Sequence, residues 1–308
     1  MASSRQLKSK IRTVGNIKQI TKAMEMVSAT KMRKSQEVAL RSRPFAKEAL
    51  SLLGNLVGHH ETETNQSIFF QEPKKGKTCL IVVTSDKGLC GSFNSQVLRI
   101  AMQWLSGKED VDIITVGKKG KDFFRKRSIT PIAEFFSFSD IATLHDVAPL
   151  SEWVLGAFEQ GRYKKVMIVS TRFFSALVQK PNIHQILPLD VEELKDAITN
   201  IVPKTGKYAE WVSQDNQQAQ LSLQLLEPSP EAILQTLVRD LVKIEILHYV
   251  FESNASEHSS RMVAMKNATE NATSLEEELQ LTLNKARQTA ITQELTEIAT
   301  AKEALSAE

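Results

Sequence analysis

The sequence predicts an α/β protein in which a small sheet domain is inserted between two long terminal helices. Three observations carry this prediction: long stretches free of proline at both ends, apolar residues at heptad-like spacing in these stretches, and a middle where short apolar runs alternate with helical patterns. Strand–helix alternation is typical of a small Rossmann-like α/β domain. We therefore expect a long antiparallel coiled coil of the N- and C-terminal helices with the α/β domain inserted in it.

The C-terminal stretch contains no helix breaker. All nine prolines lie between Pro44 and Pro230 and the last glycine is Gly206, so residues 231–308 contain neither. In "EPSPEAILQTL", Ser229 is expected at the N-cap, followed by a proline at the first helical position. At 1.5 Å per residue such a helix extends roughly 115 Å. A helix this long is typical of a coiled coil or a repeat.

Apolar residues in this stretch follow alternating steps of three and four, the a/d pattern of a heptad repeat. The predicted seam residues are mostly small, so a partner helix can approach closely. They are Met265, Ala268, Ala272, Leu275, Leu279, Thr282 and Ala286. A heavier stripe precedes them and is expected to pack on something larger. It consists of Ile233, Leu237, Leu241, Ile244, Leu247 and Phe251.

The N-terminal stretch also predicts one long helix. Residues 4–43 contain no proline and a single glycine, Gly15, which costs about 1 kcal/mol against alanine in a helix interior. Packing must outweigh that cost, or the helix bends there. The helix is expected to continue to Gly58, over roughly 80 Å. Its apolar face is expected to comprise Leu7, Ile11, Val14, Ile17, Ile20, Met24 and Val27.

The two ends carry opposite charge. Residues 1–47 hold twelve Lys or Arg against two Glu, whereas residues 270–308 hold eight Glu against three basic residues. This asymmetry indicates that the ends meet, or that each end meets a charged partner. Two solvated helix faces are the alternative.

In the middle of the chain, the spacing of apolar residues changes from the helical pattern to short apolar runs typical of strands. Strands are expected over 78–84, 111–116 and 164–171, and helices in "FNSQVLRIAMQWLSG", "KKGKDFFRKR" and "LSEWVLGAFEQG". The predicted organisation is a coiled-coil helix over 1–58, an α/β domain over 76–205 and a second coiled-coil helix over 228–308.

Two glycine-containing loops invite a phosphate-loop interpretation, but neither fits it. In "SDKGLCGSFN", Gly88 and Gly91 are only three residues apart, and "GKKGK" (117–121) matches neither G-x-x-x-x-G-K-[ST] nor G-x-G-x-x-G. Tight strand-to-helix turns explain these glycines better, so no nucleotide cofactor is expected.

Nothing else in the sequence indicates a catalytic or metal site. His59 and His60 are adjacent and diverge on a helix or strand, with no further ligand at metal spacing. His248 has apolar neighbours and is expected to be packed. Cys90 has no recognisable histidine partner, so a buried structural thiol is expected. The acidic run "LEEEL" (275–279) is expected to be a solvated face.

The composition narrows the function classes further. The chain has 308 residues, 42% hydrophobic and 24% charged, with a net charge of +3 and two cysteines. It has no basic-then-apolar signal peptide and no apolar run near the roughly 20 residues that cross a bilayer. We therefore expect a soluble protein of a reducing compartment. A basic N-terminal helix is compatible with nucleic-acid binding, but no reader motif supports it.

Three segments resemble the signature segments of the gamma subunit of the F-type ATP synthase. They are "IKQITKAMEMVSATKMRKSQ" (17–36), "VTSDKGLCGSFN" (83–94) and "RMVAMKNATENATSLEEELQLTLNKARQTAITQELTEI" (261–298). Residues 185–226 match the family poorly. The chain also lacks the paired-cysteine insert of the chloroplast forms, so thiol switching is not expected.

The resemblance implies a non-catalytic rotor shaft. In that family the terminal helices turn inside a hexamer of alternating alpha and beta subunits, and the α/β domain sits with the epsilon subunit on the membrane ring of c subunits. It implies one copy per complex, proton-coupled ATP synthesis or hydrolysis at the beta subunits, and a peripheral place on the cytoplasmic face of the bacterial inner membrane. It implies no nucleic acid, cofactor or metal.

The resemblance also implies which residues contact the beta subunits. Arg287 and Gln288 match positions that hydrogen-bond a beta-subunit loop, with Thr292 nearby, and Met24 matches a position near these contacts. A basic collar would face acidic lever loops. It comprises Lys18, Lys22, Lys31, Arg33, Lys34 and Lys87.

The sequence departs from the family at two places. The segment "ATAKEALSAE" is more helical and charged than the usual glycine-containing tip, and Gly15 replaces a helix former. Two other readings stay open on the residues alone: an α/β enzyme whose helices mediate oligomerisation, and a coiled-coil nucleic-acid adaptor with salt-dependent binding.

Overall fold

The computed structural model describes residues 4–59, 68–73, 75–136, 143–190 and 230–306. The chain forms two compact units. We call Met1–Val27 with Met262–Glu308 the helical unit, and Ser28–Arg261 the sheet unit.

The two long helices predicted at the ends are confirmed. Helix α1 runs from Ser4 to His59 and continues through Pro44, and helix α7 runs from Pro230 to Ser306. Proline suits the first position of α7 because its fixed φ is helical and its missing N–H would have no intrahelical partner there. Ser229, the predicted N-cap, lies outside the described residues.

In the helical unit, α1 and α7 pair antiparallel, as predicted. The Thr269 hydroxyl donates to Thr21 Oγ1 at 2.8 Å, and Lys18 Nζ donates to Glu276 Oε2 at 3.0 Å. The partner number on α7 rises as the number on α1 falls, which defines the direction of pairing. The added Cβ of any side chain at Gly15 would lie 3.6 Å from Glu276 Oε1, so the glycine sits on the paired face.

The predicted seam of α7 is right at five of its seven positions. Met265 and Ala272 are buried, and Ala268, Leu279 and Ala286 are half-buried. It is wrong at Leu275, which is 45% exposed, and at Thr282, which is exposed. At these two positions the following residue, Glu276 or Leu283, is half-buried instead.

The predicted apolar face of α1 is right at Leu7, Ile11, Val14 and Met24, which are buried or half-buried, and wrong at its other three positions. Ile17, Ile20 and Val27 are each about half exposed or more, at 48%, 60% and 52%. Lys18 and Thr21 occupy the paired face, because their polar atoms find partners on α7. Polar seam residues cannot be recognised from an apolar pattern alone.

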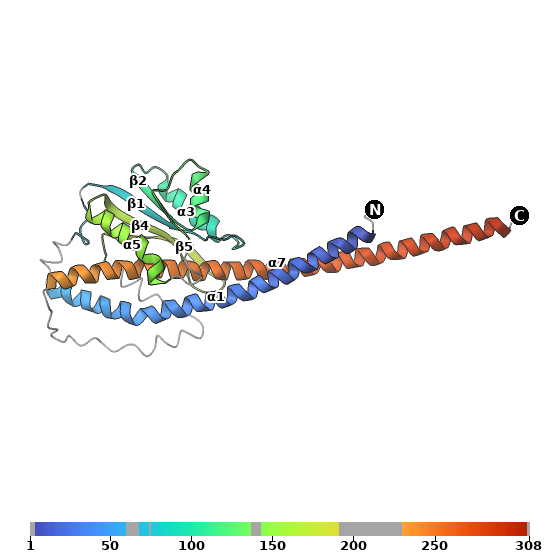
Figure 1. Ribbon diagram of the computed structural model, residues 1–308, viewed down its shortest axis with the longest axis horizontal. Helices are drawn as coiled ribbons and strands as arrows, with labels where there is room; N and C mark the ends of the chain where they lie inside the picture. Colours follow the sequence, from blue (N-terminus) through green and yellow to red (C-terminus); the bar gives the residue numbers. More distant parts are fainter. Residues whose placement is uncertain (1–3, 60–67, 74, 137–142, 191–229, 307–308) are drawn as a thin grey trace. The chain divides into compact units, whose positions relative to one another are not determined.

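The sheet unit contains a five-stranded sheet in the order β3-β2-β1-β4-β5 (Figure 1). The first four strands are parallel and β5 is antiparallel to β4. The strands are β1 (Lys77–Val83), β2 (Val111–Val116), β3 (Ala133–Phe135), β4 (Tyr163–Phe173) and β5 (Gln179–Leu187).

Helices cover both faces of this sheet. Alternate residues of β1 point to opposite faces: Leu80 and Val82 pack with α3 (Phe93–Leu105) and α4 (Lys118–Arg125). The other alternate residues of β1 pack with α5 (Leu144–Glu159), α1 and the first part of α7. Burial on both faces explains why these strands read as continuous apolar runs. The heavy stripe of α7 is confirmed as part of this core.

Two strands and one helix start were not predicted. Strands β3 and β5 are edge strands, and β5 opens with the polar, proline-containing run Gln-Lys-Pro-Asn and has few apolar residues. Helix α5 begins six residues before the predicted segment, because Thr143 and Asp146 form a capping box there.

The chain reverses direction across the sheet between β1 and β4. From β1 it moves outward to β2 and β3, and α5 returns it to β4 on the other side of β1. The carboxyl ends of β1 and β4 therefore flank a topological switch point, which is where open α/β sheets usually bind a partner.

Candidate functional site

The glycine loops at the carboxyl ends of β1 and β2 are structural turns, as predicted. Gly117 has a φ of +92°, and an added Cβ would lie 2.1 Å from the carbonyl oxygen of Thr84. Only glycine allows this backbone approach. "GKKGK" thus locks the β2–α4 turn against the end of β1.

The N-terminal amides of α4 already have partners inside the chain. Lys118 N donates to Asp86 Oδ1 at 3.0 Å, Lys119 N to the Ser85 carbonyl at 3.1 Å, and Gly120 N to Thr84 Oγ1 at 2.8 Å. A phosphate would have to displace these bonds, because anion binding at a helix N-terminus uses the same N–H groups. The loop arrangement therefore argues against nucleotide binding here.

Arg261 of α7 fastens the loop that follows β1. Its Nε and Nη2 donate to the carbonyl of Gly88 at 3.2 and 3.3 Å, and Nη2 also donates to the carbonyl of Lys87 at 3.3 Å. Glu257, one turn earlier, accepts from Nη2 at 2.6 Å. Burial raises the pKa of Glu257, and the Arg261 charge opposes that rise. Sequence reasoning did not single out Arg261; its signal is the i,i+4 spacing from Glu257.

The arginine fixes the position of a predicted contact residue. Lys87 is exposed on the loop whose backbone Arg261 holds. Cys90, in the same loop, is 3% exposed and accepts a hydrogen bond from Asn94 Nδ2 at 3.2 Å. Burial raises the pKa of this thiol, so the predicted structural role fits its surroundings.

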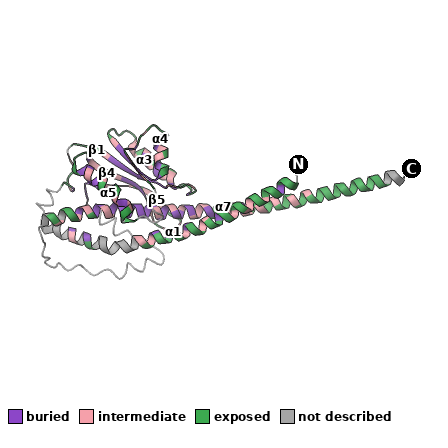
Figure 2. Ribbon diagram, in the orientation of Figure 1, coloured by how far each residue is buried: buried purple, intermediate pink, exposed green. Residues whose placement is uncertain are grey.

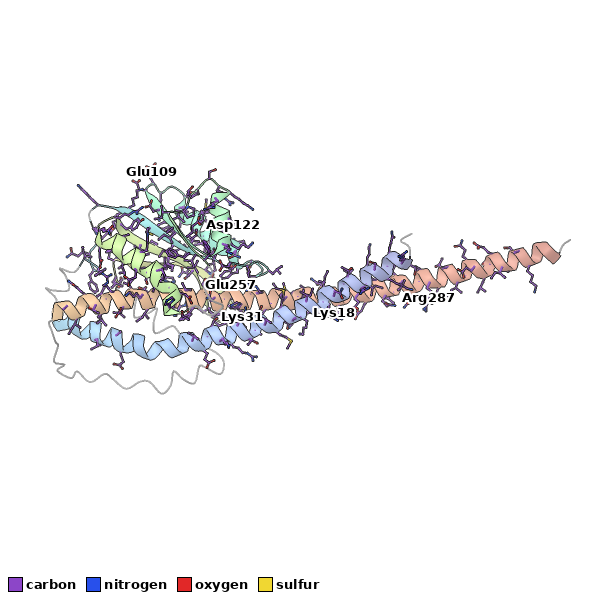
Figure 3. The ribbon with its side chains drawn as sticks, viewed as in Figure 1. Lys18, Lys31, Glu109, Asp122, Glu257 and Arg287 are labelled. Carbon is purple, nitrogen blue, oxygen red and sulfur yellow. The ribbon has the colours of Figure 1, made fainter. Side chains whose placement is uncertain are left out.

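The predicted contact residues at the end of α7 are all on the surface. Arg287, Gln288 and Thr292 are exposed, and every described side chain from 287 to 302 is exposed (Figures 2 and 3). Several threonines along α7 donate their hydroxyls to the backbone carbonyl four residues earlier. In this part of the helix they are Thr289, Thr292, Thr296 and Thr300.

The basic collar is divided between engaged and exposed residues. Lys18 pairs with Glu276, and Lys22 Nζ lies 3.0 Å from Glu25 Oε2 on its own helix. Arg33 and Lys34 are exposed, while Lys31 and Met24 are half-buried. The solvated acidic face predicted for 275–279 is correct for Glu277 and Glu278 and wrong for Glu276.

A buried ionisable pair lies on α7 inside the sheet unit. His248 Nε2 and Glu252 Oε1 are 3.7 Å apart, and both side chains are over nine-tenths buried. Burial lowers the pKa of His248 to about 3 and raises the pKa of Glu252 to about 8. Both groups are therefore neutral near pH 7 and serve the packing of α7, in line with the expectation of a packed histidine.

No three His, Cys, Asp or Glu side chains in the described part of the chain are grouped to hold a metal ion. Among the helices described, none is long and apolar enough to cross a membrane.

Comparison with known proteins agrees with the arrangement of helices and sheet. A family model described as ATP synthase matches residues 3–305. The ATP synthase gamma chain of Roseiflexus sp. (strain RS-1) is 36% identical over 310 residues, with 99% of each chain covered. That of Chloroflexus aurantiacus is 37% identical over 311 residues, covering 99% of this chain and 100% of the relative.

Solved structures share the fold at lower identity. A chain in the cryo-EM structure of the Euglena gracilis mitochondrial ATP synthase OSCP/F1/c-ring, rotational state 3, aligns with a TM-score of 0.65 at 21% identity. The match covers 99% of this chain and 95% of that one. A chain of the Tetrahymena thermophila mitochondrial ATP synthase central stalk/c-ring aligns with a TM-score of 0.57 at 22% identity, covering 81% and 99%.

Two terminal helices paired antiparallel, together with an inserted α/β domain and an exposed helical tip, define a class of protein that acts through shape and partners. The family match, which covers nearly the whole chain, identifies the family within this class. The chain belongs to the ATP synthase gamma chain family, the family of the central-stalk subunit of the F-type ATP synthase.

Proposed function

We propose that this chain is the rotor shaft of a proton-translocating F-type ATP synthase and has no active site of its own. It couples rotation of the membrane c-ring to conformational change at the catalytic sites of the beta subunits. One observation carries the proposal: α7 continues as a helix through a stretch in which every described side chain from 287 to 302 is exposed (Figure 2). A helix exposed all round requires surrounding protein or many weak side-chain pairs.

The apolar content of this tip supports an enclosing partner. Ile291, Leu295 and Ile298 are spaced by four and three residues, so they share one face, and they are 49%, 61% and 66% exposed. Such a narrow stripe buries little area against a sleeve. At about 25 cal/mol per Å² of apolar surface, a narrow contact gives a shallow energy well at any one angle.

The threonines support the same interpretation. Each hydroxyl that donates to its own helix backbone has no need of a donor contact to the sleeve. At these threonines the tip therefore presents methyl groups and short polar atoms without strong directional demands. Such a surface offers little resistance to turning.

Coupling requires directional contacts at selected angles. Arg287 and Gln288 would hydrogen-bond a loop of one beta subunit, with Thr292 nearby, because a guanidinium makes strong yet exchangeable bonds to acceptors. Met24 would lie near these contacts.

The basic collar would meet the acidic lever loops of the beta subunits through Lys31, Arg33, Lys34 and Lys87. Lys18 and Lys22 would have to exchange their internal carboxylates for those of the loop. Exposed ion pairs are worth under about 1 kcal/mol, so this exchange is energetically small. The collar would thus favour certain rotational angles of the shaft without holding the shaft at any one of them.

The expected partners are three alpha and three beta subunits around one copy of this chain, with the epsilon subunit and the c-ring at the sheet unit. The complex would place the chain at the cytoplasmic face of the bacterial inner membrane, as a peripheral protein. We expect no nucleic-acid partner.

Direct observation of rotation tests the proposal. Glu109 is exposed in the loop before β2 (Figure 3), and both native cysteines are buried, so Glu109→Cys gives one accessible thiol for a biotin linker and a bead. With the hexamer fixed to a surface, ATP should drive unidirectional steps of the bead. A complex that hydrolyses ATP while the bead stays still would overturn the rotor role.

A further inference from the structure

A cavity of about 280 Å³ lies at the topological switch point of the sheet, and all of its lining belongs to the sheet unit. The first turn of α3, which follows β1, contributes Ser92, Phe93 and Gln96, and β4 contributes Thr171 near its carboxyl end. The β4–β5 turn, the start of β5 and one residue of α7 complete the wall. Open α/β sheets bind ligands outside the carboxyl ends of their strands at such a point. We call this space the switch-point cavity.

The Thr171 hydroxyl is a buried polar group that lacks a hydrogen bond. Thr171 is 3% exposed, and its Oγ1 has no partner in the part of the chain that the structure describes. Val169, two residues earlier on β4, packs in the core beneath α3, so the side chain of Thr171 points to the same face of the sheet. The cavity lies on that face, at the start of α3. Since a buried hydroxyl without a hydrogen bond is costly, an acceptor bound in the cavity would satisfy it.

The first turn of α3 offers backbone N–H groups that no side chain caps. Ser92 stands at the N-cap without a capping bond, and its hydroxyl accepts from Gln96 Nε2 at 2.8 Å instead. The amide of Phe93 donates to the preceding loop, which leaves the next two amides of the turn without a partner among the described residues. No acidic residue lies in this turn. Unpaired N–H groups at the positive end of the helix dipole favour an anion.

This helix start differs from that of α4 on the neighbouring strand. The first amides of α4 already donate to Asp86, Ser85 and Thr84 inside the chain. An anion at α4 would have to displace these bonds, whereas an anion at α3 would add bonds that are missing. The two helix starts therefore make opposite predictions for anion binding.

The remaining lining is free of negative charge. None of the residues that line the cavity is acidic, and one of them, Lys180, is basic and exposed. The Lys180 Nζ lies 5.8 Å from the ring centre of Phe174, at the outer limit of a cation–π contact, so an anion can readily attract it away. Gln96 has a second N–H on Nε2 beyond the one given to Ser92.

The volume of the cavity limits the size of its ligand. Pockets for drug-sized molecules usually measure about 300–1,000 Å³, so a cavity of about 280 Å³ is too small for a nucleotide. A single tetrahedral oxyanion fits this space. Its oxygens accept hydrogen bonds in several directions, as donors from a strand, a helix start and a lysine require.

We propose that the switch-point cavity binds a free inorganic oxyanion of the phosphate class. The Thr171 hydroxyl, the uncapped amides of α3 and the Lys180 ammonium donate to its oxygens. The bound ion fastens the end of β4 and the start of β5 to the first turn of α3. The proposal goes beyond the rotor function, because this site lies within one chain and needs neither the hexamer nor rotation.

Titration of the full chain with inorganic phosphate tests the proposal. Amide hydrogen exchange is measured at constant ionic strength, with sodium chloride replaced stepwise by sodium phosphate. We expect saturable protection of residues 92–96 and 171–180, and no protection at 118–120, where the amides of α4 are already bonded. No saturable protection, or equal protection at both helix starts, would overturn the site.

An acetate titration separates a free oxyanion from the carboxylate of a partner chain, which shares its acceptor chemistry. Acetate at the same concentrations should give little protection of residues 92–96, because its single carboxylate reaches fewer of the donors. Protection by acetate as strong as that by phosphate would assign the cavity to a carboxylate and contradict the proposal.

Thr171→Val removes the hydroxyl and keeps the shape of the side chain. The phosphate dissociation constant, from the same titration, should rise by at least about tenfold, because a hydrogen bond to a charged group is lost. Thr115→Val is the matched control: Thr115 is 1% exposed, its Oγ1 also has no partner among the described residues, and it does not line the cavity. Its dissociation constant should equal that of the parent chain. Equal constants in both variants would refute a role for Thr171.

Lys180→Gln changes only an exposed side chain and so preserves the fold. It should weaken phosphate binding several-fold, whereas Lys126→Gln, at an exposed lysine that follows α4, should not. Equal affinities in these two variants would count against the proposed site. Because every measurement uses the chain alone, failure of the anion site leaves the rotor proposal standing.

Discussion

Lys18 and Glu276, 258 residues apart in the chain, form an ion pair with 3.0 Å between Nζ and Oε2. This pair joins the basic N-terminal stretch to the acidic C-terminal stretch inside the helical unit. Lys18 is labelled in Figure 3. Both side chains are about one-third exposed to solvent, Lys18 at 38% and Glu276 at 34%. The pair therefore specifies which faces meet more than it stabilises the fold.

We predict that removing this pair has a small effect on stability. Glu276→Gln and Lys18→Gln should each lower the free energy of unfolding by less than about 1 kcal/mol, because half-exposed ion pairs are screened. A double-mutant cycle in urea measures the coupling between the two residues. A coupling energy above about 2 kcal/mol would contradict the account.

Gly117→Ala should be strongly destabilising. The new methyl would lie 2.1 Å from the Thr84 carbonyl oxygen, at a φ of +92°. We expect a loss beyond the 1–3 kcal/mol typical of backbone strain alone, because the clash adds to it.

Gly107→Ala is the matched control for this change. Gly107 has a φ of +75°, and nothing lies within 4 Å of an added Cβ. It should show the backbone cost without the clash. Equal losses in both variants, measured by urea unfolding, would show that the Thr84 approach does not require glycine.

The buried pair on α7 predicts a pH dependence of stability. Burial raises the pKa of Glu252 to about 8, against about 4.3 in an unfolded chain, so the folded state holds an extra proton between these values. The contribution of the protonated carboxyl to the free energy of unfolding is therefore greatest below pH 4.3, and it is lost as the pH rises toward 8. Arg172 of β4 opposes the rise in pKa, and His248 is the neighbouring titratable group.

Glu252→Gln removes this titration while keeping the size of the side chain. As pH rises from 5.5 to about 8, the variant should gain stability relative to the parent protein by about 1.4 kcal/mol for each pH unit. Below pH 6.5 both proteins should lose stability as His248, whose pKa is about 3 when buried, charges in the unfolded chain. Parallel pH profiles for the two proteins would refute the assignment to Glu252.

Arg261→Gln should loosen the loop that carries Lys87. The guanidinium holds two carbonyls of this loop and the Glu257 carboxylate, and hydrogen bonds to charged groups are worth about 1.5–3 kcal/mol. Amide exchange of residues 86–90 should accelerate. Arg125→Gln is the control, because Arg125 is exposed and pairs with Glu134 instead of this loop, so the variant should leave the loop unchanged. Unaltered exchange in Arg261→Gln would show that the loop is held by other bonds.

Added apolar surface at the tip of α7 should slow the reconstituted complex, whereas polar substitutions there should not. Replacing Thr289, Thr296 and Thr300 together by leucine should slow ATP hydrolysis by the reconstituted complex, because larger apolar contacts deepen the angular wells. The matching serine variants keep the hydroxyls and should turn over normally. Leucine variants with unchanged turnover would contradict the low-resistance tip.

The sequence predicts most of the fold because prolines, glycines and apolar runs mark the limits of its helices and strands clearly. Proline and glycine limits located both long helices, and continuous apolar runs located β1, β2 and β4. Edge strand β5 was missed because it opens with the run Gln-Lys-Pro-Asn, whose polar residues and proline are typical of a loop.

The details of the helix pair could not be read from the sequence. Leu275 is the better apolar candidate, yet Glu276 faces α1 because Lys18 occupies the opposing position. Such a pairing depends on both helices together, and one helix alone carries no sign of it. The same holds for Arg261, whose role depends on a loop more than 170 residues away.

The contact residues Arg287, Gln288 and Thr292 rested on family resemblance and stay predictions, because exposed residues of this tip gain a role only from a partner chain. The domain limits 76–205 and 228–308 also stay predictions, since residues 191–229 lie outside the described part of the chain.

The rotor proposal requires that this chain assembles as the single shaft of an alpha/beta hexamer. Native mass spectrometry of the chain mixed with alpha and beta subunits from the same source, with ATP hydrolysis assayed alongside, tests this assembly. We expect a complex of three alpha, three beta and one copy of this chain that hydrolyses ATP only when the chain is present. A well-folded chain that stays outside the hexamer, or a hexamer whose activity is independent of it, would contradict the rotor proposal.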